Sequence, residues 1–356
     1  MRPRQARTAC DSPPIDPSFF NIGTTIMDKS SQPTRRRAVA SLAAAPWLLQ
    51  GAARAQAVWP SKPIRYVVTF AAGGFASNFA RVLAEPLGRS LGQSVYIDNR
   101  AGAGGLIGVD NIAKSPADGY SIVMTAANTT AIIPAVMGSK MPYEPLRDLT
   151  PIVYLINQPN VLVAHPSVPT GKFADFVAWA KSRPGEGFGT PGMATSNHIM
   201  GEMLSSNLGI QLAHVAYKGG APLTIDLLAG TVNLAVLNIV DAVPLVADGR
   251  VKPILVSSAQ RSELLPNVPT MQELGASAFP LISWQGIFGP AGLSASIVSR
   301  LNASFNDALK AGPVQGWMHA NGATPVGGTP DDLRRFVESE QRLWGDLVRK
   351  YKITNT

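Results

Sequence analysis

The residues best suited to chemistry lie in short glycine-rich or polar stretches that follow predicted strands. Gly73 and Gly74 come after the apolar run 66–70 and before an amphipathic helical pattern that Ser77 is expected to cap. Glycines let the backbone approach a ligand closely, and a helix N-terminus presents unpaired N–H groups and a partial positive charge. Such a stretch can hold a small anion. It can equally be a tight turn that uses glycine for steric reasons, so this stretch alone leaves both interpretations open.

An enzyme would need a base, a nucleophile or a metal site. Ser196 and His198 could form a nucleophilic pair, but no G-x-S-x-G motif surrounds Ser196. The other histidines lack the spacing of metal ligands: His165, His214 and His319. A structural or ligand-contacting role is therefore favoured for His198, and no metal or cofactor is expected.

Three further side chains have a functional and a structural interpretation. Arg100 is the best cationic partner for a distal ligand carboxylate, but an ion pair with Asp98 is at least as compatible with the sequence. Lys218 has the same two interpretations. Trp284 could line a cleft, although core packing is favoured.

The charge of the chain is concentrated near its start. The formal net charge is +8, but residues 1–57 hold eight basic and three acidic residues, which leaves about +3 for residues 58–356. No basic run or stripe accompanies this weak excess. The sequence therefore argues against a nucleic-acid partner.

The N-terminal segment has the pattern of an export signal. Arg35–Arg37 precede an apolar run, and small residues of the A-x-A type end at Ala57. We expect cleavage there and a periplasmic product; the consecutive arginines permit the twin-arginine route, and the route stays open. The single cysteine, Cys10, lies before the cleavage point, so the mature protein would contain neither disulfides nor a reactive thiol.

Hydrophobic periodicity along the remaining chain predicts strands that alternate with helices. This alternation is typical of an α/β fold with parallel strands and right-handed crossovers. We expect a leader over 1–57, a discontinuous domain 1 over 58–159 plus 283–356, and a domain 2 over 160–282. The return to domain 1 is based on the predicted strand 281–289 and on the apolar faces of the helices after it.

Loops at the carboxyl ends of strands bind ligands in open α/β sheets. Five positions qualify here, and they offer glycine N–H groups, hydroxyls and amides but few ionisable groups: 71–77, 125–130, 192–197, 217–220 and Asn238. Such a lining suits a carboxylate held by neutral dipoles, directly or through water.

The chain resembles the Bug family, the extracytoplasmic solute receptors of tripartite tricarboxylate transporters. Motifs in the family's order cover essentially the whole mature chain: 59–64 (WPSKPI), Gly73–Gly74, 98–105 (DNRAGAGG), 118–120 (DGY), 166–169 (PSVP), 217–219 (YKG), 226–230 (DLLAG), 261–262 (RS), 265–270 (LPNVPT) and 289–292 (GPAG). The resemblance implies a type II periplasmic-binding-protein fold in which two α/β domains close on a small carboxylated solute. It also implies a non-enzymatic protein, expected to be monomeric, that delivers the solute to a membrane permease of the tripartite tricarboxylate type.

The loop positions and the resemblance together predict the ligand-binding residues. These are Ala72, Gly73, Gly74, Phe75, Ser77, Asn128, Thr129, Thr195, Ser196, His198, Tyr217, Lys218, Gly219 and Asn238. Family members typically hold the ligand carboxylate through bridging waters, so both direct and water-mediated contacts stay open.

The departures from the family concern the ligand. Ser77 stands where the family usually has aspartate, and Leu237 stands where it often has another acid. The first loop has Ala71 and Ala72 in place of proline, and Thr130 takes a position where histidine is common. The lost acids make an amino-acid ligand less suitable and favour a neutral-tailed or aromatic mono- or dicarboxylate. A Ser77→Asp variant would then shift preference toward amino-bearing ligands.

Two alternatives to a transport receptor remain open. The same fold could present its ligand to a membrane kinase as a sensor component. A secreted hydrolase that uses Ser196 and His198 is the less favoured alternative, and it predicts ester turnover that Ser196→Ala abolishes.

Overall fold

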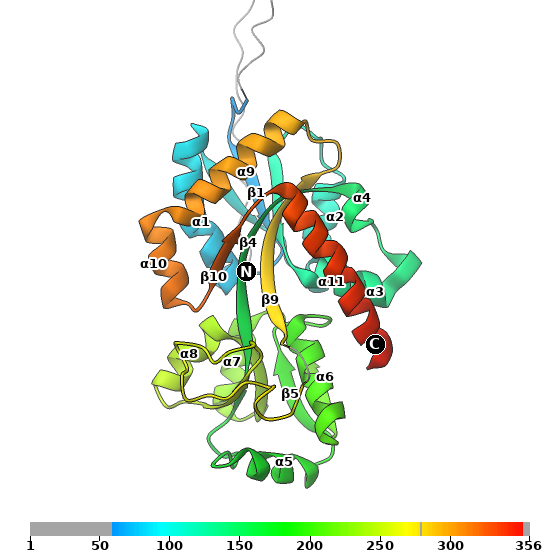
Figure 1. Cartoon of the computed structure of the whole chain (residues 1–356), viewed down its shortest axis with the longest axis vertical. Coiled ribbons are helices and arrows are strands. Elements are labelled where there is room, and N and C mark those ends of the chain that lie inside the picture. Colours follow the sequence, from blue (N-terminus) through cyan, green and yellow to red (C-terminus); the bar gives the residue numbers. More distant parts are fainter. Residues whose placement is uncertain (1–58, 278–279, 352–356) are drawn as a thin grey trace, which may run out of the picture. The chain divides into compact units, whose positions relative to one another are not determined.

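The first part of the described chain alternates short apolar strands with helices, as Figure 1 shows in blue to green. The computed structural model describes residues 59–277 and 280–351. The elements up to residue 164 are β1 (Ile64–Val68), α1 (Phe75–Leu91), β2 (Val95–Asn99), η1 (Ala103–Gly105), α2 (Leu106–Ala113), β3 (Ser121–Thr125), η2 (Asn128–Ile132), α3 (Ile133–Met137), η3 (Gly138–Lys140), α4 (Pro145–Asp148) and β4 (Leu149–Ala164).

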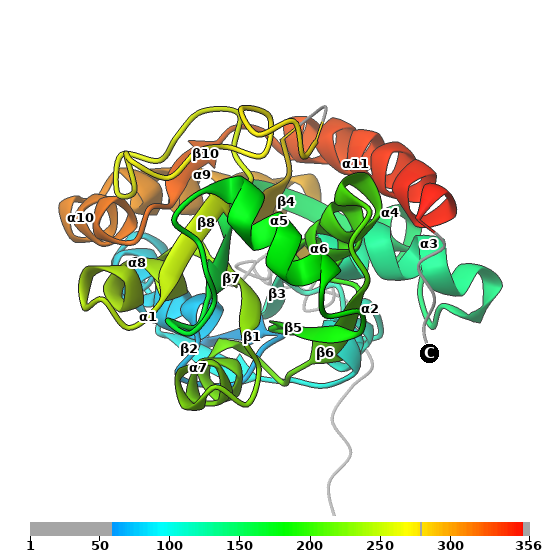
Figure 2. The same cartoon turned by 90° about the horizontal axis from the view of Figure 1, so that it is seen from below.

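The rest of the chain continues the alternation and then ends in helices. The next elements are α5 (Phe173–Lys181), β5 (Glu186–Thr190), α6 (Ser196–Leu208), β6 (Leu212–Ala216), α7 (Gly220–Ala229), β7 (Leu234–Asn238), α8 (Ile239–Ala247) and β8 (Lys252–Val256). The last are β9 (Ile282–Pro290), α9 (Ala295–Lys310), α10 (Gly312–Ala320), β10 (Thr324–Gly327) and α11 (Pro330–Lys350). Figure 2 shows α5, α6, α7 and α8 arranged around strands β5 to β8.

The strands of the described chain hydrogen-bond in the order β2-β1-β3-β9-β4-β7-β5-β6, and β10 and β8 also pair with β4. The pairs β1 with β2, β1 with β3, β5 with β6 and β5 with β7 are parallel, as the βα alternation predicts. Strands β4, β9 and β10 add antiparallel pairs. The predicted parallel arrangement is therefore correct for the crossover units and incomplete for the whole sheet.

Strand β4 is 16 residues long and contains two prolines, Pro151 and Pro159. It pairs with β9 from Leu149 opposite Pro290 to Pro159 opposite Ile282, and its later residues pair with β7 and β8. Proline lacks the N–H that a sheet ladder uses, so Pro151 and Pro159 argue against a strand in the sequence. The structure accommodates Pro151 beside a register irregularity between Pro151 and Val153.

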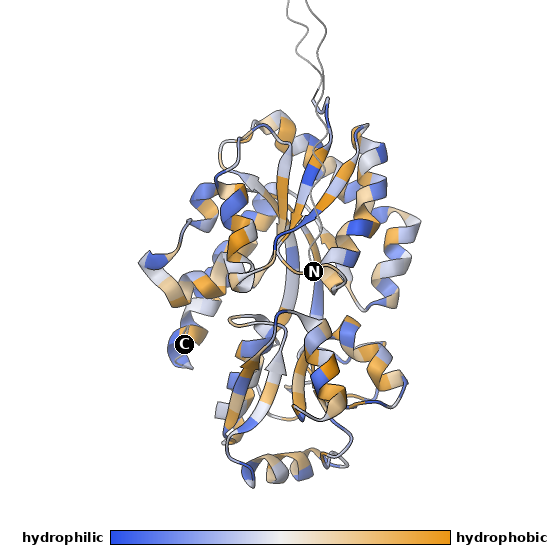
Figure 3. Cartoon of the chain, turned by 180° about the vertical axis from the view of Figure 1, so that it is seen from behind, coloured by the Kyte–Doolittle hydropathy of each residue, from blue (hydrophilic) through white to orange (hydrophobic). Residues whose placement is uncertain are grey.

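Alternate residues of each strand face opposite sides of the sheet and meet different helices. Val68 packs in one buried cluster with α1 and α9, whereas Val67 packs in another cluster with α2 and α11. In β7, Val236 faces α6, and Leu237 faces α7 and α8. Helices therefore cover both faces, and in Figure 3 they carry apolar and polar residues on different sides. This confirms the predicted α/β class and the predicted amphipathic helices.

The domain division stays a prediction. The residues expected at its boundaries, Pro159 and Ile282, are paired partners on β4 and β9, so the boundary falls within paired strands rather than in loops. The predicted leader, its arginines and Cys10 lie outside the described residues. Within 59–277 and 280–351, every helix is too short or too polar to cross a membrane.

Candidate functional site

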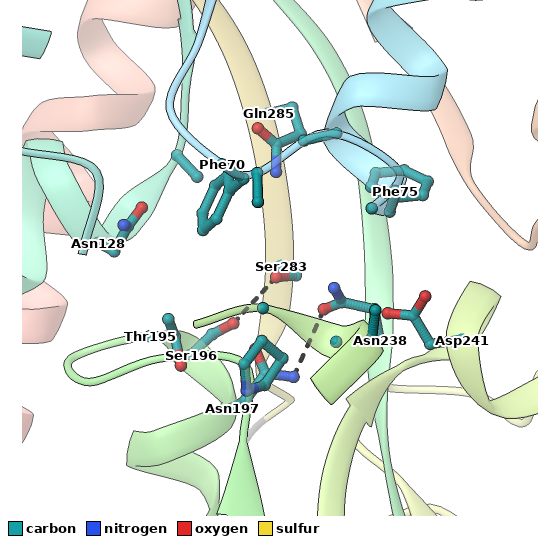
Figure 4. Close-up of a pocket in the computed structure, with 18 of the residues that line it drawn as sticks. Phe70, Phe75, Asn128, Thr195, Ser196, Asn197, Asn238, Asp241, Ser283 and Gln285 are labelled. Atoms are coloured by element: carbon teal, nitrogen blue, oxygen red, sulfur yellow. Dashed lines mark hydrogen bonds between the residues drawn. The ribbon is translucent and has the colours of Figure 1, made fainter. Parts of the chain in front are cut away.

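A pocket of about 110 Å³ is lined by residues from all five predicted loop positions (Figure 4). This volume holds several water molecules or a small solute. Nine of the predicted ligand-binding residues line it: Ala72, Gly74, Phe75, Asn128, Thr195, Ser196, Lys218, Gly219 and Asn238. The predicted convergence of these loops is therefore present in the structure, and ligand contact by these residues stays a prediction.

Four helix N-termini meet at this pocket. The N-cap residues of α1, α6, α7 and α8 are Gly74, Thr195, Gly219 and Asn238, and each lines the pocket. In α1, α7 and α8 no side chain caps the first turn. The first N–H groups of a helix have no partner within it, and the helix dipole places partial positive charge there. The pocket therefore favours a negatively charged group.

Glycine is required where α7 begins. Gly219 has φ of +125°, a conformation that L side chains rarely adopt, and its neighbour Gly220 leaves room beside Asp241. A Cβ on Gly220 would come within 3.0 Å of Asp241 Oδ2. The sequence Lys218-Gly219-Gly220 thus keeps backbone, rather than side chains, at this edge of the pocket.

A buried amide network fixes the floor of the pocket. The two N–H groups of Asn197 Nδ2 are shared among three acceptors, Asn160 Oδ1 at 3.2 Å, Val236 O at 3.2 Å and Asn238 Oδ1 at 3.4 Å. Because the oxygen of Asn238 accepts from Asn197, its Nδ2 group is free to donate, and Figure 4 shows this nitrogen directed into the pocket. Asn238 is thus oriented as a donor for an anionic ligand.

Ser196 takes part in the same floor. Its Oγ accepts from Asn160 Nδ2 at 3.2 Å and lies 3.0 Å from Ser283 Oγ, on the strand that enters the site from the other side. Ser257 Oγ in turn accepts from the backbone N–H of Asn160 at 2.8 Å. These bonds join β4, α6 and β9, so the first turn of α6 is held in a defined position.

Two amide side chains in the pocket wall have oxygens without a partner. Asn128 Oδ1 and Gln285 Oε1 are buried and accept no hydrogen bond from any described residue. Asn128 Nδ2 donates to Gly104 O, which fixes the amide with its oxygen as the remaining acceptor. Buried polar atoms are normally hydrogen-bonded, so these two oxygens are sites where a ligand or water donor would be satisfied.

Two charged side chains line the pocket, Lys218 and Asp241. Lys218 is exposed, whereas Asp241 is mostly buried in the first turn of α8. Burial raises the pKa of Asp241 from 3.8 to about 6. Sequence reasoning missed Asp241 because it lies three residues beyond Asn238, inside a helix rather than in a loop.

Phe70 before the first loop and two polar residues of the strand β9 were also missed, whereas Phe75 was predicted. Phe70 and Phe75 form an apolar wall, and Phe75 stacks on Phe79 with ring centroids 6.0 Å apart. Ser283 and Gln285 lie in an otherwise apolar strand at a spacing of two. That spacing puts both on one face of the sheet, and it is a signal that could have identified them.

Five predicted residues do not line this pocket. Gly73 lies outside it, Thr129 contacts Thr125 and Ala126 O, and Tyr217 donates its hydroxyl proton to Asp226 Oδ2 at 2.8 Å. Ser77 and His198 also face other parts of the protein. A role in ligand binding for these five stays a prediction.

The predicted cap at Ser77 is wrong. The cap of helix α1 lies three residues earlier, because Gly74 itself takes the extended N-cap conformation, with φ of −79° and ψ of 171°. Ser77 is fully buried within the first turn, and its hydroxyl donates to Asn99 Oδ1 at 3.2 Å. Ser77 therefore connects α1 to the end of β2 and does not cap the helix.

Ser196 and His198 do not form a nucleophile and base. His198 Nδ1 accepts from the backbone N–H of Ala194 at 3.1 Å, and the ring stacks on His214 with centroids 3.7 Å apart. Burial, and secondarily the neighbouring His198, lowers the pKa of His214 to about 3, so His214 is neutral. The two stacked rings support the start of α6, and Ser196 Oγ pairs with Asn160 and Ser283 rather than with His198.

Contacts bear on two other side chains with open interpretations, Arg100 and Trp284. Arg100 Nε donates to Asp98 Oδ2 at 2.8 Å and lies outside the pocket, as the structural interpretation predicts. Trp284 both lines the pocket and packs in the core, where its Nε1 donates to the buried Glu340 Oε2 at 2.8 Å. Within the described ranges no group of three or more metal-ligating side chains could hold a metal ion.

Comparisons with known proteins agree with this geometry. Residues 79–353 match the family described as the tripartite tricarboxylate transporter family receptor. The protein BugT of Bordetella pertussis is 36% identical over 293 residues, which cover 82% of this chain and 90% of BugT.

Two solved structures share the fold along nearly their full length. The periplasmic binding protein BugD is 31% identical with a TM-score of 0.78, and the match covers 83% of this chain and 99% of BugD. The R. palustris protein Rpa4515, solved with adipate, is 32% identical with a TM-score of 0.79 and the same coverage. These neighbours are solute-binding proteins rather than enzymes, and they have the periplasmic-binding-protein fold. The chain belongs to the tripartite tricarboxylate transporter receptor family, the TctC or Bug solute receptors.

Proposed function

We propose that this protein is a periplasmic receptor that captures a small carboxylated metabolite and delivers it to a membrane permease of the tripartite tricarboxylate type. The observation that carries the proposal is the meeting of four helix N-termini at one pocket. Such an arrangement favours a small anion without requiring a fixed positive charge. The adipate bound by Rpa4515 is a solute of the same chemical class.

The ligand carboxylate would lie between the first turns of the helices. Backbone N–H groups at Gly74 and Gly219 and the Nδ2 group of Asn238 can donate to its oxygens, directly or through water. Hydroxyls of Thr195 and Ser196 complete this polar side. Because the residues come from separate loops, a ligand that contacts them would hold these loops together.

The body of the ligand would lie against the apolar wall. Phe70, Phe75, Pro191 and Pro222 line the pocket, together with several alanines of the loops 71–77 and 125–130. Burial of apolar area contributes about 25 cal/mol per Å², so a few methylene groups add measurably to affinity. The wall therefore favours a carboxylate with an aliphatic or aromatic body over a small inorganic anion.

Calorimetric titration tests the proposal directly. The protein is unfolded and refolded to remove any co-purified solute and is then titrated with a panel of aliphatic and aromatic mono- and dicarboxylates, adipate included. We expect at least one member to bind, and Asn238→Leu to weaken it by about tenfold, since a hydrogen bond to a charged group is lost. Asn207→Leu is the matched control, because Asn207 lies on α6 outside the pocket.

Two outcomes would contradict the proposal. One is that no carboxylate of the panel binds at millimolar concentration. The other is that Asn238→Leu changes affinity no more than Asn207→Leu does. Delivery to a permease is tested separately, by comparing uptake of the identified ligand in cells with and without this gene; uptake that is unchanged would leave a receptor without the proposed transport role.

A further inference from the structure

Asp241 is a carboxylate in the pocket without a partner. It lines the pocket beside Asn238, as Figure 4 shows, and it makes no hydrogen bond or ion pair with any residue of the described chain. Its neighbour across the gap is the backbone of Gly220, where a Cβ would lie 3.0 Å from Oδ2. An acceptor-only group that is mostly removed from water normally has a donor, and here the protein supplies none.

The surroundings of Asp241 do not neutralise its charge. The main elements packed on α8 are β4, β7 and β8. Helix α7, whose Asp226 accepts from Tyr217, approaches Asp241 at Gly220. Strands β4 and β7 carry no charged residue, and Lys252 of β8 donates to the carbonyls of Pro166 and Val168. Lys218 lines the same pocket, but its ammonium group forms no ion pair with Asp241 within 4.0 Å. The charge of Asp241 is therefore available to a ligand.

Other acceptors in the pocket are also without donors. Asn128 Oδ1 and Gln285 Oε1 are oxygens of side chains that are 3% and 6% exposed, and neither has a partner. The hydrogen bond from Asn128 Nδ2 to Gly104 O prevents this amide from turning its nitrogen toward the pocket. Together with Asp241, the pocket offers more acceptors than a ligand made only of carboxylates and carbon could satisfy.

We propose that Asp241 is a specificity-determining residue, which selects carboxylates that also carry a hydrogen-bond donor, either a hydroxyl or an ammonium group. This inference rests on the proposed function, because it concerns a second group of the same ligand. The helix N-termini hold one carboxylate, and Asp241 accepts from the donor. A bare second carboxylate at the position beside Asp241 would meet a like charge instead.

This assignment revises the expectation based on Ser77 and Leu237. Those positions lack the acids that the family often has, but Asp241, in the first turn of α8, places a carboxylate in the pocket. The raised pKa of Asp241 is consistent with a carboxylate that lacks donors in the unliganded protein. A donor from the ligand would stabilise the ionised form, so selectivity should weaken when the pH falls below about 6.

The test is a titration of matched ligand series at pH 7.5 and at pH 5. Each series contains an unsubstituted acid and its hydroxy and amino derivatives, for example succinate, malate and aspartate, or adipate with 2-hydroxyadipate and 2-aminoadipate. At pH 7.5 we expect the tightest ligand to carry a donor and to bind at least about tenfold more tightly than its unsubstituted parent. The hydroxy and amino members show which donor is selected.

Variants at Asp241 separate the charge from the hydrogen bond. Asp241→Leu should abolish the preference for either donor, and Asp241→Asn should abolish it for ammonium while it retains an acceptor for hydroxyl. Asp248→Asn, at the other end of the same helix and outside the pocket, should leave the preference unchanged. Correct folding of each variant is checked by its thermal unfolding curve.

The outcomes distinguish this inference from the proposed function. If the unsubstituted acids bind as tightly as their derivatives, and Asp241→Leu does not change their ratio, the inference is overturned while a carboxylate receptor remains. If the preference for a donor-bearing ligand is the same at pH 5 as at pH 7.5, the charge of Asp241 does not select the ligand and the inference is also overturned. If no carboxylate binds, both proposals fall together.

Discussion

Replacing Asp241 by asparagine should stabilise the unliganded protein at neutral pH. The ionised carboxylate is mostly buried without a donor, and this burial raises its pKa from 3.8 to about 6. A carboxyl group whose pKa is higher in the folded state binds protons more tightly there than in the unfolded chain. Folding at neutral pH therefore carries the free-energy cost of ionising this group, and asparagine removes it.

The magnitude follows from the pKa. A rise from 3.8 to about 6 corresponds to ~3 kcal/mol as an upper bound, at about 1.36 kcal/mol per unit. Partial exposure of Asp241 to the pocket reduces this, so we expect the variant to gain about 1–3 kcal/mol in free energy of unfolding at pH 7.5. The gain should be full above about pH 6, decline between pH 6 and 3.8, and vanish below 3.8, where both states of the wild type are protonated.

The assay is urea unfolding of refolded, solute-free protein at several pH values. The difference between variant and wild type is the quantity of interest, because His214 titrates in the same range and cancels in the difference. The pKa of His214 is lowered to about 3 in the folded state, so its protonation on unfolding destabilises both proteins as the pH falls below 6.5. Asp307→Asn, an exposed aspartate of α9 with no partner, should change stability by about 0.5 kcal/mol or less. A loss of stability in Asp241→Asn, or a gain that is the same at pH 7.5 and pH 3.5, would refute the reasoning.

Two further predictions concern the packing around the site. Gly201→Ala should lower the free energy of unfolding by about 1–2 kcal/mol, because its Cβ would lie 2.0 Å from Phe188 Cε2 and the better helix propensity of alanine offsets only part of the strain. Gly316→Ala, on α10 with open space around the new Cβ, should instead stabilise by about 0.5–1 kcal/mol, and equal effects at the two glycines would contradict this account. Glu340→Ala should destabilise by about 3 kcal/mol or more, because the Nε1 groups of Trp284 and Trp344 both donate to Glu340 Oε2, at 2.8 and 2.7 Å, and would lose their acceptor. Thermal unfolding with Glu338→Ala as the control measures this, and a loss no larger than that of the control would show that the two indoles find other partners.

The sequence predicted the helices and short strands well because each has a clear hydrophobic period. Phe79, Leu83, Leu87 and Leu91 repeat every four residues and are all buried in α1. The first ten residues of β4 and the strand β10 could not be predicted in the same way. Prolines interrupt both strands, and the strands that pair with them lie far away in the sequence: β9 pairs with β4, and β4 pairs with β10.

The loops of the site were predictable, but several side-chain orientations were not. Loops after parallel strands meet at one edge of a sheet, so Gly74, Thr195 and Asn238 were correctly placed near one another. Which side chains after each loop face the pocket depends on the residue at which the following helix begins. Because α1 begins at Phe75, Ser77 turns inward to Asn99.

The raised pKa of Asp241 also bears on how a ligand carboxylate gains affinity in this pocket. Asp241 lies in the first turn of α8, where the helix dipole favours a negative charge, and yet desolvation still raises its pKa. Burial in this pocket therefore costs an anion its hydration unless hydrogen-bond donors replace the lost water. A ligand carboxylate meets the same cost, so its affinity must come from direct or water-mediated donors such as Asn238 Nδ2 and the free N–H groups of the first turns. Recognition in this receptor then depends on hydrogen bonds more than on net charge. Protein N–H groups donate to the ligand oxygens, and an N–H or O–H group of the ligand donates to Asp241.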